Sequence, residues 1–68
     1  MKAAKIENSP RLQRVAKYLS DGLKHSTRDI MYSAHACAVS AAVSELRENG
    51  FDIKCQRVDN VWYYRMEV

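Results

Sequence analysis

The segment STRDIMYSAHACAVSAAVSELRENG, residues 26–50, decides the fold because it holds two short helical patterns joined by a tight bend. In the second pattern Val39, Val43 and Leu46 follow one another at offsets of four and three residues, so they share one face of a helix. This apolar face must be buried in a core. The opposite side of the same helix then exposes Ser40, Ala41, Ser44 and Arg47.

The first helix of the pair has a well-marked start. Ser26 is placed to cap it, and Asp29 stands three residues later, as in a capping box and near the positive end of the helix dipole. Thr27 and Arg28 lie in the same first turn, where a hydroxyl and a cation are suited to hold a phosphate. They serve equally well as ordinary solvent-facing residues.

The bend between the two helices, residues 32–36, contains no glycine. We therefore expect His35 to adopt the left-handed backbone conformation, which His tolerates better than most other residues. His35 and Cys37 lack the partners and the spacing of a tetrahedral metal site. The sequence predicts neither a metal ion nor another cofactor.

A further helix is predicted upstream, with Ser9 as its N-cap, Pro10 at its first position and an end near Ser20. Its apolar stripe consists of Leu12, Val15, Ala16 and Leu19, and its opposite face carries Arg11, Arg14 and Lys17. That cationic face is either a solvated helix surface or a clamp for a DNA backbone. Residues 23–25 are expected to form a short extended strand.

Downstream of Gly50 the hydrophobic pattern changes to strict alternation, which predicts two strands between Phe51 and Met66. Asp59 and Asn60 form the predicted turn, because both tolerate a positive φ. We expect the inward side to carry Phe51, Ile53, Cys55, Trp62, Tyr64 and Met66, and the outward side Asp52, Lys54, Gln56, Tyr63 and Arg65.

Three helices followed by a C-terminal β-hairpin predict an α+β fold of the winged helix-turn-helix type. We expect residues 1–8 to form a flexible arm and residues 9–68 to form the winged helix-turn-helix domain. The last helix of such a domain fits the major groove of duplex DNA, and the hairpin wing reaches the flanking groove.

The run CAVSAAVSELRENGFDI, residues 37–53, together with the ending YRM at 64–66, resembles the small helix-turn-helix proteins of bacteriophages and prophages. The resemblance covers most of the chain after Asn8. It implies a winged-helix fold and a role in DNA binding and transcription regulation. Ser40 and His35 stand where such proteins often carry Asn and Gly.

Composition narrows the class of protein. Eleven basic and eight acidic residues give a net charge of +3, which favours a polyanionic partner only where the cations gather on one face. No apolar run approaches the roughly 20 residues that span a bilayer, and no secretory signal or paired C-x-x-C spacing is present. We expect a cytoplasmic protein with reduced thiols and no membrane partner.

No motif typical of an active site is found, so we expect no enzymatic activity.

Two functions remain open. In the first, the chain is a regulator or accessory factor that binds double-stranded DNA and associates with the bacterial nucleoid, with a homodimer as a further assembly. In the second, it is a phage-encoded module that modulates a host protein through the small side chains of Ala36, Cys37, Ala38 and Ala41. The predicted DNA contacts are Thr27, Arg28, Cys37, Ala38, Ser40, Ala41, Ser44, Arg47, Lys54, Arg57 and Asn60.

We predict that the isolated chain folds without a metal ion and without a disulfide, because its apolar stripes supply a complete core and its Cys and His residues lack ligand spacing. The test is circular dichroism in the presence of a chelator and a reductant. Loss of the helical signal under those conditions would show that Cys37, Cys55 or a histidine has a structural role.

Overall fold

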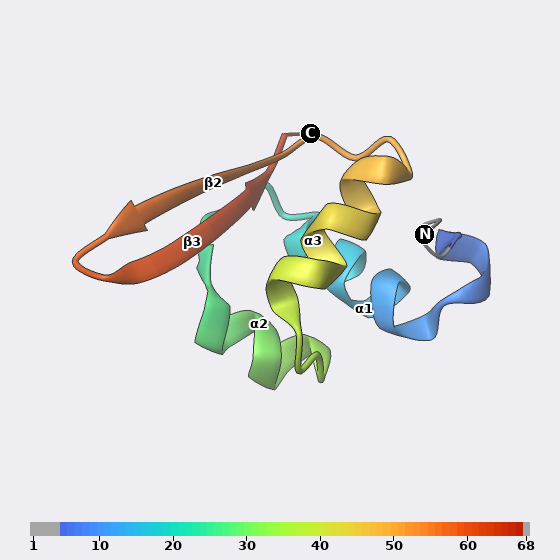
Figure 1. Ribbon diagram of the computed structural model, residues 1–68, viewed down its shortest axis with the longest axis horizontal. Coiled ribbons are helices and arrows are strands. Elements are labelled where there is room, and N and C mark those ends of the chain that lie inside the picture. The colour runs from blue at the N-terminus through green and yellow to red at the C-terminus, as the bar shows by residue number, and fades with distance from the viewer. Residues whose placement is uncertain (1–4, 68) are drawn as a thin grey trace.

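The computed structural model describes residues 5–67. It shows three α-helices packed against a small sheet near the base of its hairpin (Figure 1). A 3-10 turn, η1, at Ile6–Asn8 precedes the first helix. The α-helices are α1 (Pro10–Leu19), α2 (Thr27–Ala34) and α3 (Val39–Glu48), and the strands are β1 (His25–Ser26), β2 (Ile53–Val58) and β3 (Val61–Met66).

The three strands form an antiparallel sheet in the order β1-β3-β2. His25 pairs with Tyr64 across β1 and β3, and Ile53 pairs with Met66 across β2 and β3. The expected α+β class, with three helices and a C-terminal hairpin, is confirmed. The short strand expected at residues 23–25 lies instead at His25–Ser26, where it pairs with β3. This element order is compatible with a winged helix.

The local signals for α1 and α2 act as predicted. The backbone N–H of Leu12 donates to Ser9 Oγ at 3.3 Å, and that of Asp29 donates to Ser26 Oγ at 3.1 Å. His35 ends α2 in the left-handed conformation, with φ 52° and ψ 45°. The polypeptide therefore turns toward α3 without a glycine.

The loop before β1 is held by Asp21. The backbone N–H of Leu23 donates to Asp21 Oδ1 at 2.8 Å, and His25 Nε2 lies 2.9 Å from the same oxygen. These two contacts, the first more than the second, hold the pKa of the exposed Asp21 carboxyl below its usual value. They fix the place where the short strand begins.

One core joins all three helices to the base of the hairpin. The buried side of α3 meets Leu12, Val15 and Leu19 of α1 and Ile30 of α2. The part of the sheet that lies over this core contributes Ile53, Tyr64 and Met66, and the α3 side chains concerned are Val39, Ala42, Val43 and Leu46.

The outer half of the hairpin departs from the prediction. Cys55 and Trp62 were expected to point into the core, but both are exposed, and Trp62 keeps 46% of its accessible surface. The hairpin is longer than the helical layer beneath it, and Figure 1 shows it projecting beyond the helices. Alternation thus identifies the correct face of the strands, but the core ends before it reaches Trp62. Cys55 lies opposite the buried Tyr64, and it is exposed because β2 is an edge strand of the sheet.

The N-terminal segment is docked on the domain from Ile6 onward. The backbone N–H of Ile6 donates to Asn49 Oδ1 at 3.0 Å, and Gln13 Nε2 donates to the Ile6 carbonyl at 2.9 Å. Ile6 also packs against the core. Residues 1–4 of the expected flexible arm lie outside the described residues. Within residues 5–67, no helix is long and apolar enough to cross a membrane.

We predict that Leu46→Ala lowers the free energy of unfolding by about 2–5 kcal/mol, because it removes a fully buried side chain from the centre of the core. Thermal or chemical denaturation measures the change. A variant that unfolds like the parent chain would show that Leu46 is not in the core.

Candidate nucleic-acid interface

A hollow of about 550 Å³ lies between α3 and the hairpin, and we call it the α3–hairpin groove. Cys55 and Trp62 line its hairpin side. The sequence predicts core positions for both residues. The length of the strands relative to the helices is the signal that could have placed Trp62 in the groove. Six of the eleven predicted contact residues also line this groove: Thr27, Cys37, Ala38, Ser40, Ser44 and Arg47.

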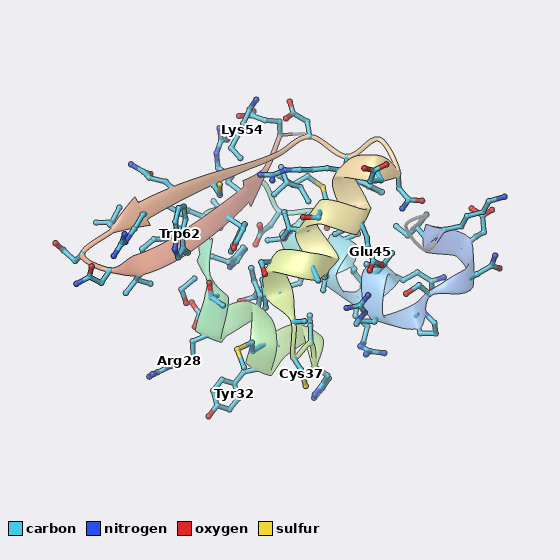
Figure 2. The ribbon with its side chains drawn as sticks, viewed as in Figure 1. Arg28, Tyr32, Cys37, Glu45, Lys54 and Trp62 are labelled. Carbon is cyan, nitrogen blue, oxygen red and sulfur yellow. The ribbon has the colours of Figure 1, made fainter. Side chains whose placement is uncertain are left out.

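A second hollow of about 1020 Å³ adjoins the first between α2 and the hairpin turn, and we call it the α2–hairpin hollow. Thr27 lines both hollows. Arg28 and Asn60, two further predicted contact residues, lie here beside the exposed side chains of Met31 and Tyr32. Arg28 projects away from the body of the protein next to Tyr32 (Figure 2).

The remaining predicted residues are more scattered. Ala41 is exposed on α3 without lining either hollow, and Arg57 is exposed on β2, where its Nη2 donates to Asn60 Oδ1 at 2.7 Å. Lys54 lies on the opposite face of the sheet, where its Nζ is 3.3 Å from Asp52 Oδ1. The fold therefore does not bring Lys54 together with the groove residues.

The two hollows have a simple electrostatic character. Arg47 is the one charged residue that lines the α3–hairpin groove, and Arg28 is the one that lines the α2–hairpin hollow. No carboxylate among the described residues lines either surface. A polyanion can therefore approach both hollows without meeting a like charge at close range.

Arg47 combines two roles. Its Nε and Nη2 donate to the Ile53 carbonyl oxygen at 3.0 and 2.7 Å, which ties α3 to the first residue of β2. Arg47 is exposed, as the sequence predicts, and its guanidinium folds back onto the Ile53 carbonyl. The positive charge stays at the end of the groove, while the hydrogen bonds fix the angle between helix and hairpin.

The cations of α1 are used in a similar way. Arg11 Nη2 lies 3.0 Å from Glu45 Oε2 on α3, and Arg14 Nε donates to the Ala34 carbonyl at 2.9 Å. Lys17 is exposed. Two of the three cations on this face therefore hold α1 to its neighbouring helices. This weakens the hypothesis that the face is a clamp for a DNA backbone.

No cofactor site is identified in the part of the chain that the structure describes. Within it, no group of three or more His, Cys, Asp or Glu residues is placed to hold a metal ion, and Cys37 and Cys55 are free, exposed thiols. No protein-family model, no curated protein and no solved structure matches the chain. Function is therefore inferred from the geometry and the sequence.

We predict that Arg47→Met lowers the free energy of unfolding by about 1 kcal/mol, because it removes charge-assisted hydrogen bonds at an exposed site. Amide hydrogen exchange of β2 should accelerate more than that of α1. Arg28→Met is the matched control, since Arg28 makes no hydrogen bond or ion pair among residues 5–67. Equal effects of the two substitutions on stability and exchange would show that the Arg47 hydrogen bonds do not hold α3 to β2.

Proposed function

We propose that the chain is a non-enzymatic winged helix-turn-helix protein that binds double-stranded DNA, as a phage or prophage transcription regulator or accessory factor. In this proposal α3 enters the major groove and the hairpin wing contacts the flanking groove. The observation that carries the proposal is the pair of adjoining hollows that α3 and α2 form with the hairpin, whose lining contains two arginines and no carboxylate.

Phosphate contacts are assigned to residues at the rim of these hollows. Arg28 is exposed in the first turn of α2, where free backbone amides add to its positive charge. Thr27 offers a hydroxyl beside it, and Arg57 carries a second exposed guanidinium on the hairpin. Contacts of this kind supply salt-dependent affinity and orient a protein on the duplex without reading its sequence.

Base contacts are assigned to the exposed side of α3. Ser40, Ala41 and Ser44 are exposed and small, so the helix backbone can come close to base edges. Their hydroxyl and methyl groups give weaker discrimination than the bidentate contacts of Arg, Asn or Gln. We therefore propose that general attraction to DNA exceeds sequence preference in a single domain.

A protein-binding module is the second candidate. Met31 and Tyr32 keep 43% and 77% of their accessible surface and both line the α2–hairpin hollow, where they offer apolar contact area to a partner. They lie on α2 next to the small side chains that precede α3. A host protein that covers this surface would leave the chain without measurable affinity for DNA.

We predict that affinity for duplex DNA falls steeply with salt and that Arg28→Glu weakens binding about tenfold at 0.1 M salt, whatever the DNA sequence. Glu is favoured in the first turn of a helix, so this variant should keep its fold. Fluorescence anisotropy of labelled duplexes at several salt concentrations measures both effects. Arg57→Glu should behave in the same way.

Lys17→Glu is the matched control, because it makes the same charge change on α1 outside both hollows. Its effect on binding should be clearly smaller. An equal loss of affinity in the control would show that net charge, and not this surface, attracts DNA. If the parent chain binds no duplex even at low salt, the DNA-binding proposal is wrong and the protein-binding module takes its place.

A further inference from the structure

Trp62 is the only tryptophan of the chain, and the core does not explain its position. It keeps 46% of its accessible surface and lines the α3–hairpin groove. Figure 2 shows it on the part of the hairpin that projects beyond α3. A large aromatic side chain exposed at the wall of a groove offers contact area to a ligand.

The backbone of Trp62 is held in place by the start of α2, which follows directly on the strand beside β3. Thr27 Oγ1 donates to the Trp62 carbonyl oxygen at 3.3 Å, which links the start of α2 to β3. The side chain is thus presented from a fixed backbone position, and binding a ligand need not first order this part of the hairpin. Such preorganisation lowers the entropic cost of association.

A cation stands next to the indole. Arg57 is directly opposite Trp62 in the β2–β3 register, so both side chains lie on the same face of the sheet, with Cβ atoms about 4.5–5.5 Å apart. Arg28 does not line this groove; it lies in the α2–hairpin hollow. An aromatic plane beside an arginine matches a ligand in which apolar rings alternate with anionic groups.

We propose that Trp62 is a DNA-contact residue whose indole packs against the deoxyribose groups of one strand where that strand passes between the hairpin and α3. This inference rests on the proposed function. In a duplex the bases are stacked inside, so an indole outside it meets sugars, and a flanking phosphate faces Arg57. A groove of about 550 Å³ admits the backbone of one strand, whereas a whole duplex is too wide for it.

Salt dependence distinguishes this apolar contact from an ionic one. Removing a cation that neutralises a phosphate lowers the slope of log affinity against log salt by about one. Removing an apolar contact lowers affinity by the same factor at every salt concentration and leaves the slope unchanged. Trp62 and Arg57, although neighbours, are therefore expected to differ in this measurement.

The experiment is a titration of the full chain with a short labelled duplex, in which anisotropy of the label reports binding and Trp62 emission reports the contact. We expect the emission to change in step with the anisotropy. Trp62→Ala should weaken binding about tenfold with an unchanged salt slope, and Trp62→Phe should recover most of the affinity. Val58→Ala is the matched control, since Val58 is exposed on the other face of the sheet and lines neither hollow.

Each alternative outcome has a defined meaning. Binding without a change in Trp62 emission, or Trp62→Ala binding like the parent, overturns the inference and leaves the proposed function intact. A reduced salt slope in Trp62→Ala overturns it as well, because Trp62 would then act only by positioning Arg57. An equal loss in Val58→Ala overturns it too, because the effect would then come from general damage to the hairpin and not from the indole. No anisotropy change at low salt rejects the proposed function itself.

Discussion

The structure depends on the burial of one face of α3. Val39, Val43 and Leu46 lie against α1 and the base of the hairpin with almost no accessible surface. Because successive helical residues are rotated by a fixed angle, burying this face determines which side chains the helix exposes. The small residues that line the α3–hairpin groove are a geometric consequence of the core, and a change of register would remove both together.

Features set by neighbouring residues were predictable from the sequence. Ser9 and Ser26 cap their helices, His35 takes a positive φ in place of glycine, and Asp59 and Asn60 both have positive φ in the hairpin turn. Each of these follows from steric and hydrogen-bonding rules that operate over a few residues. The order and the type of the elements follow from the same rules.

Features set by residues far apart in the sequence were not predictable. Arg11 pairs with Glu45 and Arg14 with the Ala34 carbonyl, over separations of 34 and 20 residues, and no local pattern indicates these contacts. The exposure of Trp62 was not predictable either. Alternation assigns it to the inner face of the sheet, but only the three-dimensional extent of the helical layer decides whether anything covers that face. The structure therefore adds Trp62 to the candidate site that the sequence predicts and removes Lys54 from it.

The use of cations inside the domain constrains how it could hold DNA. Arg11, Arg14 and Arg47 each bind a group of the protein, so few exposed cations beside the groove remain to neutralise phosphates. Since each neutralised phosphate contributes to affinity separately, a domain with few such contacts attracts DNA only moderately. Apolar contact through Trp62 is one way to add affinity. Association of two copies on a two-fold symmetric site is the other, because the second domain then binds at a high effective concentration.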